Sequence, residues 1–388
     1  IGTDGEGINS YDPVSRKFQH YSSTLKKKIV SIAGYSESEL LLSSFADRLW
    51  LLNKVTGQLR PFEIHDPDIN HLIQFTGRSL NLANEQDGDI LLVSNHICRL
   101  DKKTGRCTRL NTNSGNAAGN LYIIGHGNNE IWVHDEYNIY RITEGSDTVE
   151  KVASHSDAVI RSGHMGNADD IWMASEHGLC RFSIRENSFT HIEAPLFSEA
   201  VSVVCDKDSR IWMGTDKGLF AYLDGNGSFA MFGESDGATS NEYLSKPRLL
   251  SNDGDVYMGG TRGLLRINRE YEIDEMENPQ IRLDYLEVDN TPIKKEDENR
   301  YRIPRTCRVV EIGVSVSEKD IFRNKRFRFT LSGNGKTYET SSPSLRIKNL
   351  PGLGKNDVMV SCTRRDGEWT EPTRIMTLVV PVPWYRSW

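Results

Sequence analysis

Apolar side chains occur in short runs separated by Gly- and Asx-rich turns along the first two thirds of the chain. The clearest run covers residues 211–215 (Ile-Trp-Met-Gly-Thr), where apolar side chains fall on both alternating faces. Such a segment is typical of a strand in a sheet that is covered on both sides. Residues 216–218 provide a turn ending in Gly, and residues 219–222 form an apolar return strand. The pattern predicts a β-hairpin.

Copies of this hairpin recur at a regular period. They begin at residues 40, 90, 131, 171, 211 and 256, with separations of 50, 41, 40, 40 and 45 residues, and residues 1–8 match the end of one more copy. A period of roughly 40 to 45 residues with several short strands is typical of a β-propeller blade. Residues 1–277 are therefore predicted to form a seven-bladed β-propeller with four antiparallel strands per complete blade. Because the chain begins within a repeat, we expect a fragment of a longer protein, with three strands in the first blade.

A different strand pattern follows the repeats. Residues 278–388 contain apolar strands without the 40-residue period, and a domain of this length is typical of an immunoglobulin-like β-sandwich. Phe327 and Phe329 alternate with Arg326 and Arg328, which predicts that the Phe side chains face inward and the Arg side chains face solvent. The predicted fold class is all-β, a propeller followed by a sandwich, with the domain boundary after residue 277.

Composition narrows the possible partners. The chain has 388 residues, 37% of them hydrophobic and 32 of them glycine, which indicates a turn-rich chain of about two domains. Its net charge of -7 argues against a general nucleic-acid or anionic-membrane surface and favours neutral or cationic ligands. No apolar run approaches the ~18 residues of a membrane-spanning helix, and no signal peptide is recognised.

Six cysteines show no zinc-type spacing, and they occupy positions 98, 107, 180, 205, 307 and 362. Cys98 and Cys107 flank a turn and could face each other across neighbouring strands, and Cys307 and Cys362 could bridge two sheets. Buried free thiols are the favoured interpretation.

The sequence contains none of the motifs that usually carry catalysis. Neither a nucleophile elbow, a phosphate-binding loop nor a His-Glu-x-x-His helix is found. Residues 66–70 have the opening spacing of a calcium loop, but His71 and Gly77 stand where Gly and Glu are required. We therefore expect neither an enzyme, nor a cofactor, nor a bound metal in this region.

Two stretches resemble a known family. The repeat Ile-Trp-Met-Gly-Thr-x-x-Gly-Leu of residues 211–219 resembles the two-component regulator propeller repeat, and residues 278–388 resemble the Y_Y_Y domain that follows it. The second resemblance depends on Arg328-Phe329, Leu350-Pro351, Asp366-Gly367-Glu368-Trp369 and Pro383-Trp384-Tyr385. The sequence departs from the family pattern at Phe329 and Tyr338, which replace a Tyr and a Trp, and at residues 355–357.

The resemblance implies the periplasmic sensor region of a hybrid two-component histidine kinase. It further implies signal transduction in response to an oligosaccharide, transcriptional control of polysaccharide utilisation, and anchoring in the inner membrane. A membrane helix is expected after Trp388, because prolines and aromatic residues of an interface type precede it, and we expect a homodimer through the parent protein. The alternative is a protein-interaction propeller without a small-molecule ligand.

Candidate ligand-binding residues are those that interrupt the repeat pattern, because residues that conform to it are explained by packing. They lie in an enlarged connection, in the fourth unit and before the fifth central strand, and are His71, Arg78, Asn81, Trp132, His134, Asp135, Arg161 and His164. Aromatic faces and bidentate polar groups suit a polyhydroxylated sugar. Alternatively, Trp132 belongs to the blade core and each isolated His is a hydrogen-bonded structural residue.

Overall fold

A computed structural model describes residues 1–382 with several gaps. The gaps are residues 22–27, 46, 67–79, 113–119, 167–168, 195–196, 198, 226, 234–235, 239–241, 274–278, 298, 318–324, 334, 349–352 and 365–366. The described residues form strands and turns and no α-helix, so the predicted all-β class is confirmed. Within these residues there is no helix long and apolar enough to cross a membrane.

Seven sheets follow one another along residues 8–267, with 2, 4, 4, 5, 4, 4 and 3 strands. The first four contain β1 (Ile8–Asp12), β2 (Lys17–Tyr21), β3 (Ile29–Gly34), β4 (Glu39–Ser44), β5 (Leu49–Asn53), β6 (Leu59–Phe62), β7 (Asn81–Asn84), β8 (Ile90–Val93), β9 (Ile97–Leu100), β10 (Cys107–Arg109), β11 (Asn111–Thr112), β12 (Tyr122–His126), β13 (Glu130–His134), β14 (Asn138–Thr143) and β15 (Thr148–Ser154). The last three contain β16 (Ile160–Met165), β17 (Asp170–Ser175), β18 (Gly178–Ser183), β19 (Ser188–Ile192), β20 (Ala200–Cys205), β21 (Arg210–Thr215), β22 (Gly218–Leu223), β23 (Ser228–Phe232), β24 (Tyr243–Leu250), β25 (Val256–Gly260) and β26 (Gly263–Ile267).

The chain divides into two compact units, which are described separately. The first consists of Ile1–Glu193, Ser198–Met213 and Leu244–Leu250, and the second consists of Ala194–Phe197, Gly214–Tyr243 and Ser251–Trp388. The predicted domain boundary after residue 277 falls among residues 274–278, which the structure does not describe, and it stays a prediction.

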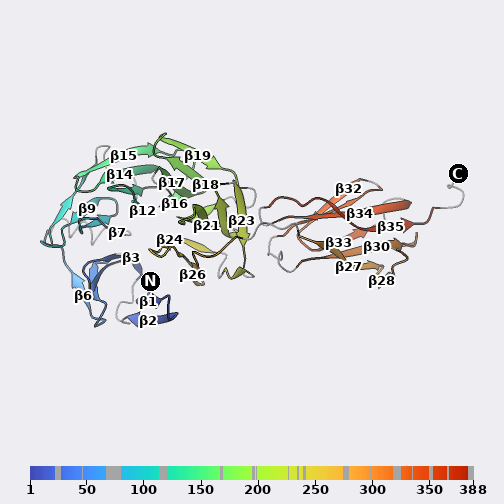
Figure 1. The fold of residues 1–388 in the computed structure, drawn as a ribbon, viewed down its shortest axis with the longest axis horizontal. Helices are drawn as coiled ribbons and strands as arrows, with labels where there is room; N and C mark the ends of the chain where they lie inside the picture. The colour runs from blue at the N-terminus through green and yellow to red at the C-terminus, as the bar shows by residue number, and fades with distance from the viewer. Residues whose placement is uncertain are drawn as a thin grey trace. The chain divides into compact units, whose positions relative to one another are not determined.

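In the first unit, the innermost strand of each sheet packs beside the innermost strand of the next. These contacts join β3 to β7, β7 to β12, β12 to β16, and β16 to β20, and Figure 1 shows the corresponding sheets. Side chains on both faces of the central strands are buried, as in β17, where all six residues are buried. Sheets that stack face to face need apolar residues on both faces, so the packing accounts for the sequence pattern.

A pair of one Trp and one Arg recurs within the sheets and reinforces the central strands β13 and β17. Trp132 and Trp172 lie directly opposite Arg141 and Arg181 on the neighbouring strands. The guanidinium carbons of these arginines lie 5.9 and 5.7 Å from the ring centroids, within the range of a cation–π contact. The repeated Trp therefore contributes to packing, and an arginine guanidinium lies over its ring.

Three sheets depart from the predicted numbers of strands, and the seventh sheet has three strands in place of four. The first sheet, for which three strands were predicted, has only β1 and β2, because residues 1–7 form isolated bridges at Gly2 and Asp4 in place of a third strand. Gly5 and Gly7 take positive φ values of 99° and 82°, which interrupts extended backbone. In the fourth sheet, β11 adds a parallel fifth strand beside β15.

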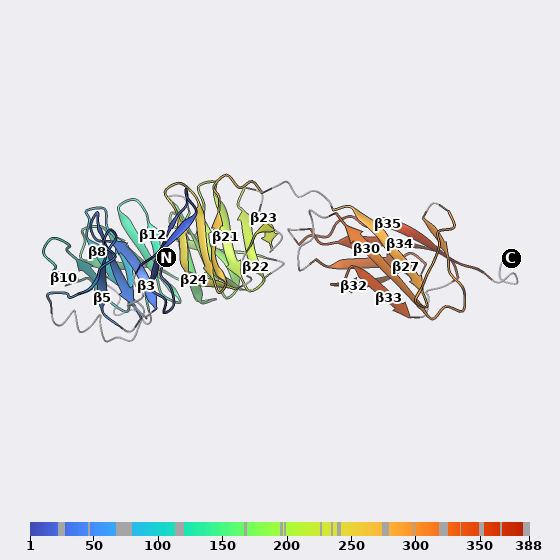
Figure 2. The same cartoon turned by 90° about the horizontal axis from the view of Figure 1, so that it is seen from below.

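Two further sheets within the second unit share one core. They have the orders β28-β27-β30-β33 and β29-β35-β34-β31-β32, and their strands are visible in Figure 2. The bounds are β27 (Ile281–Val288), β28 (Thr291–Pro292), β29 (Arg300–Arg302), β30 (Val309–Val316), β31 (Phe327–Leu331), β32 (Lys336–Thr340), β33 (Ser344–Lys348), β34 (Gly354–Cys362) and β35 (Thr373–Val380). Ile312 and Phe329 come from opposite sheets and are both fully buried in this core. The predicted inward Phe residues of β31 are confirmed, whereas the immunoglobulin-like topology stays a prediction.

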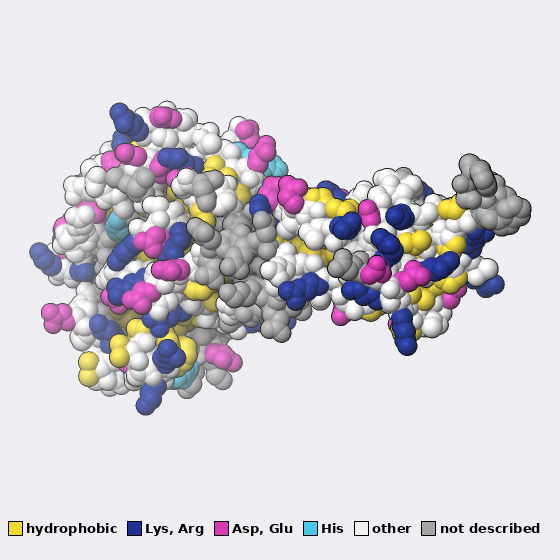
Figure 3. Space-filling view, turned by 45° about the vertical axis from the view of Figure 1, so that its right-hand side comes forward, with side chains coloured by type: hydrophobic (Ala, Val, Ile, Leu, Met, Phe, Trp, Pro, Cys, Tyr) yellow, Lys and Arg dark blue, Asp and Glu magenta, His cyan; other side chains and the backbone are white. Residues whose placement is uncertain are grey.

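All six cysteines are free thiols. Cys98 and Cys107 lie on the neighbouring strands β9 and β10 in diagonal positions, since Cys98 is opposite Arg109 and Cys107 is opposite Leu100. Figure 3 shows one face of the protein, on which Lys and Arg side chains are interspersed with Asp and Glu. This mixed surface agrees with a modest net charge.

Candidate functional site

Asp135 is the most heavily hydrogen-bonded of the predicted ligand-binding residues that the structure describes. It follows β13 in the turn to β14 and is 2% exposed. Its carboxylate accepts hydrogen bonds from the backbone N–H of Tyr137 and Asn138, from the Asn138 amide and from the Tyr140 hydroxyl, all between 2.7 and 2.9 Å. Buried carboxylates need such partners. Asp135 therefore stabilises its own turn, and its oxygens face protein donors.

Trp132 is placed in the blade core, as the alternative interpretation expected. It is 1% exposed and packs with Ile139 and Met173 in one apolar cluster. A sugar stacks on an exposed aromatic face. Trp132 offers no such face in this structure, and its contribution is to packing.

Asn81 and Arg161 lie at different places on the first unit. Asn81 is buried, and its amide donates to the carbonyl oxygens of Val93 and Leu121 at 3.4 and 2.9 Å. Arg161 is exposed and pairs with Glu176 and Glu199 at 2.7 and 3.3 Å. His71 and Arg78 lie outside the described residues.

His134 and His164 are brought to a common neighbour, Arg248 of β24. His134 is fully buried, its Nδ1 lies 2.9 Å from the carbonyl oxygen of Asp135, and its Nε2 has no hydrogen-bond partner among the described residues. His164 Nδ1 lies 2.8 Å from the carbonyl oxygen of Met165 and 3.2 Å from the backbone nitrogen of Cys205. Burial, and secondarily the charge of Arg248, lowers the pKa of each imidazole to about 4. Both rings are therefore neutral at pH 7.

Arg248 joins three innermost strands. Its guanidinium donates from Nη2 to the carbonyl oxygens of Ile123 in β12 and Gly163 in β16, at 3.2 and 2.5 Å. Nη1 donates to the carbonyl oxygen of Ser245 at 2.7 Å. Innermost strands are sheet edges, so their outward carbonyl groups lack ladder partners, and Arg248 supplies donors to two of them.

A second cation lies beside this group. The ammonium of Lys246 lies 4.7 Å from the centroid of the Tyr122 ring, and Tyr122 is the cross-strand partner of His134. Although Lys246 is an exposed residue, partial burial of its ammonium and the charge of Lys28 lower its pKa to about 8. Arg248, Lys246, Tyr122, His134 and His164 are called the inner-strand cluster below.

The sequence analysis identified the two histidines of this cluster and missed the other three members. Arg248 lies 125 and 85 residues from the two distant carbonyl groups that it contacts. No local pattern links such positions. The only sequence signal was a pair of basic residues two positions apart in β24, Lys246 and Arg248, because alternate residues of a strand share a face.

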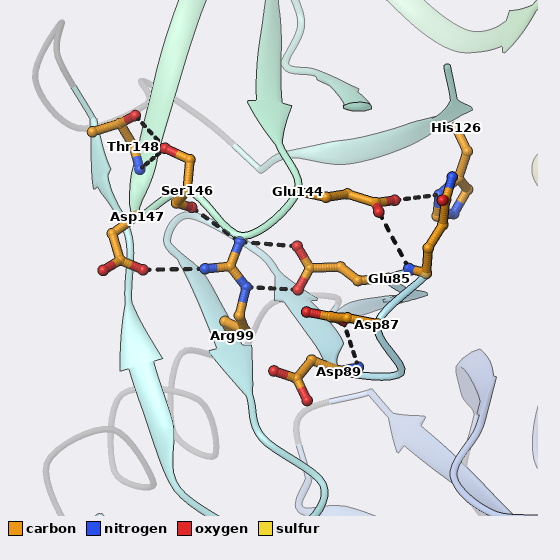
Figure 4. A network of polar contacts seen from close by, with 10 residues as sticks. Glu85, Asp87, Asp89, Arg99, His126, Glu144, Ser146, Asp147 and Thr148 are labelled. Atoms are coloured by element: carbon orange, nitrogen blue, oxygen red, sulfur yellow. Dashed lines mark hydrogen bonds and ion pairs between the residues drawn. The ribbon is translucent and has the colours of Figure 1, made fainter. Parts of the chain in front are cut away.

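Two other places have polar groups that could suggest a site. Carboxylate oxygens of Glu85, Asp87 and Asp89 lie within 4.8 Å of one another, but Glu85 is already paired with Arg99, at 2.6 Å (Figure 4). In the second unit, a groove of about 570 Å³ is lined by residues of β27, including Tyr285, and by Tyr301 and Arg374. The sequence analysis had no signal for this groove, which forms between strands of different sheets.

The low pKa values of the two histidines predict acid sensitivity. Since folding lowers the pKa of His134 from 6.5 to about 4, the unfolded chain binds more protons in this interval, and the free energy of unfolding falls as pH drops from 6.5 to 4. A shift of this size corresponds to roughly 3 kcal/mol for a buried group. Urea unfolding of His134→Gln, measured from pH 7.5 to 4.5, should show a flatter pH dependence than the parent chain. His191→Gln, at an exposed position of β19, should retain the parental slope, and an unchanged slope in His134→Gln would contradict the assignment.

Comparison with known proteins identifies solved structures with a similar fold and one relative by sequence. No family profile matches the chain. The chain is 22% identical over 199 residues to histidine kinase P4 of Formosa agariphila, a match that covers 48% of the chain and 14% of that protein. The chain thus spans a small fraction of the length of the curated relative it matches.

Solved structures with a similar fold include β-propeller proteins. A streptogramin B lyase superposes with a TM-score of 0.53 at 17% identity, covering 68% of this chain and 87% of the lyase. The extracellular domain of a hybrid two-component system from B. thetaiotaomicron covers 98% of this chain and 82% of its own, with a TM-score of 0.43 and 12% identity. The class of protein is therefore defined by its fold: an all-β chain with a β-propeller.

Proposed function

We propose that this chain is the extracytoplasmic ligand-sensing region of a two-component histidine kinase and that it binds an oligosaccharide. The observation that carries the proposal is the inner-strand cluster, where cationic, aromatic and imidazole groups converge on neighbouring strands. Convergent polar groups beside an aromatic face are typical of a small-ligand site. The sequence match to a histidine kinase supports the sensor role.

The proposed region is periplasmic and non-catalytic, and its parent protein is anchored in the inner membrane. The ligand regulates polysaccharide utilisation through the kinase, whose dimer transmits the signal. Transmission requires that the ligand bind one of two arrangements of the dimer more tightly than the other. The membrane helix is expected beyond Trp388.

A thermal-shift screen against a panel of oligosaccharides tests this function. A ligand that binds only the folded chain raises its stability by about 2.7 kcal/mol at 100 times its Kd. We expect at least one oligosaccharide to raise the melting temperature and to be recovered without cleavage. Release of a product would contradict the non-catalytic role.

Matched arginine variants locate the site. Arg161→Ala is expected to lower the affinity for an oligosaccharide found in this screen by a few fold, if the predicted surface takes part in binding. Arg60→Ala removes an exposed arginine with a similar ion pair, to Glu39 at 3.1 Å, and should leave affinity unchanged. Stabilisation by a protein partner, with no response to any sugar, would favour the alternative of a protein-interaction propeller.

A further inference from the structure

The positive charge of Arg248 is not balanced by a carboxylate. Among the residues that the structure describes, its guanidinium contacts only the carbonyl oxygens of Ser245, Ile123 and Gly163. Burial lowers its pKa to about 10, so the group remains charged at pH 7. Other semi-buried arginines of the first unit have carboxylate partners, for example Arg99 with Glu85 and Arg210 with Asp206. A partly buried cation without a counter-charge is unfavourable unless an anion joins it.

The guanidinium also retains unused donors. An arginine has five N–H groups, of which three are engaged by the carbonyl groups of Ser245, Ile123 and Gly163. The Nε–H and one N–H of Nη1 have no partner among the described residues. Nε–H lies on the edge that it shares with Nη2, and the unused N–H of Nη1 lies on a different edge of the guanidinium plane. Each of the two can therefore donate a single hydrogen bond to an oxygen of an anion.

Neighbouring groups add to the positive potential and supply a hydrogen-bond acceptor. Lys246 shares β24 with Arg248, lies two residues away on the same face, and forms no ion pair with any described residue. His134 is fully buried, and its Nε2 lacks a partner among the described atoms. Because Nδ1 donates its proton to the carbonyl oxygen of Asp135, Nε2 of the neutral ring is an acceptor and can take a hydrogen bond from a ligand hydroxyl.

We infer that the inner-strand cluster is a subsite for an anionic group, a carboxylate or a sulfate ester, carried by the ligand. Arg248 and Lys246 hold the negative charge, and Tyr122 and His134 contact the ring or hydroxyl groups that bear it. The inference rests on the proposed function and specifies its ligand as an acidic oligosaccharide. The net charge of the chain led us to expect neutral or cationic ligands, and this inference differs from that expectation. The electrostatic potential at a binding site is set by nearby groups, because charges farther away than about 8 Å are largely screened in physiological salt.

The competing explanation is that Arg248 serves only as a clamp between innermost strands. A clamp needs the guanidinium donors and no ligand, so it predicts that removing Arg248 lowers stability and leaves discrimination between charged and neutral sugars unaltered. A subsite predicts a loss of that discrimination. The two explanations therefore differ in a measurable ratio of affinities.

Calorimetric titration of the whole chain tests the subsite with paired ligands. A uronic-acid oligosaccharide is compared with its carboxyl-reduced form, and a sulfated oligosaccharide with its desulfated form. We expect the anionic member of at least one pair to bind ten-fold or more tightly. That preference should fall to within about two-fold in Arg248→Gln and to an intermediate value in Lys246→Gln, because the second cation is exposed.

Two control variants keep the test decisive. Arg248→Lys preserves the charge and is expected to retain part of the preference, which covers the case in which Arg248→Gln unfolds. Lys54→Gln removes one positive charge from an exposed turn after β5 and should leave the preference intact. Equal losses in Lys54→Gln and Lys246→Gln would overturn the inference, since the effect would then be general charge screening.

The outcomes separate this inference from the proposed function. Equal affinity for both members of every pair overturns the anionic subsite and leaves oligosaccharide sensing in place. If no oligosaccharide binds, sensing of sugars fails, and the subsite is judged with sodium glucuronate and sodium sulfate alone. A shift of the Arg248 Nε–H resonance by either anion, absent with glucose, would support the subsite, and no shift with either would overturn it.

Discussion

Trp212→Ala is expected to lower the free energy of unfolding by about 3–5 kcal/mol, the usual cost of removing a large buried aromatic side chain. Trp212 is 1% exposed in β21, and its indole N–H donates to Asp206 at 2.8 Å. The guanidinium carbon of Arg210 lies 5.9 Å from the ring. The substitution leaves a cavity and also removes one donor from a buried carboxylate, so two losses add. Guanidinium unfolding followed by circular dichroism measures the change.

Trp50→Ala is the matched control for this prediction. Trp50 is also a strand tryptophan whose indole N–H donates to an aspartate, Asp47, at 3.3 Å, but it is only half-buried. Less apolar area is lost, so the expected cost is smaller. Equal effects of the two substitutions would show that burial in the repeated strand does not decide the contribution of its tryptophan.

The repeated architecture could be predicted from the sequence because the same packing problem recurs in every blade. A central strand covered on both faces requires apolar residues at successive positions, and the hairpin that follows requires a glycine with positive φ, such as Gly178 or Gly218. Ser175 and Thr215 each donate to the carbonyl oxygen of that glycine, at 3.1 and 2.9 Å. Local requirements of this kind leave a visible period in the chain.

The candidate site could be predicted only in part, because a residue that interrupts a repeat does so for more than one reason. Asp135 departs from the repeat because its carboxylate accepts the hydrogen bonds of its own turn, and Trp132 fills the core. His134 and His164, in contrast, lie beside a cation contributed by β24. Burial and hydrogen bonding separate these cases, and neither is visible in the sequence. Arg248 belongs to no motif, since the inner-strand contacts that define its role appear only when distant strands are brought together.

The second prediction with a large expected effect on stability concerns the ion pair between Glu85 and Arg99. Arg99 contacts both carboxylate oxygens of Glu85, at 2.6 and 2.9 Å, and also Asp147 and the carbonyl oxygen of Ser146 (Figure 4). The Glu85 side chain is fully buried, and that of Arg99 is 11% exposed. Arg99→Met would leave the carboxylate buried without its counter-charge, which costs about 3–5 kcal/mol for a pair of this kind.

A double-mutant cycle distinguishes loss of the pair from creation of an unpaired charge. Glu85→Gln combined with Arg99→Met removes both charges, so it should recover much of the stability lost in Arg99→Met alone, measured by urea unfolding at pH 7. Arg60→Met is the control at an exposed pair, where the Arg60 and Glu39 side chains are 60% and 21% exposed, and it is expected to cost less than about 1 kcal/mol. If the double variant were no more stable than Arg99→Met, the stability would derive from the hydrogen bonds of Arg99 to Asp147 and Ser146, and the desolvated charge of Glu85 would not be the cause.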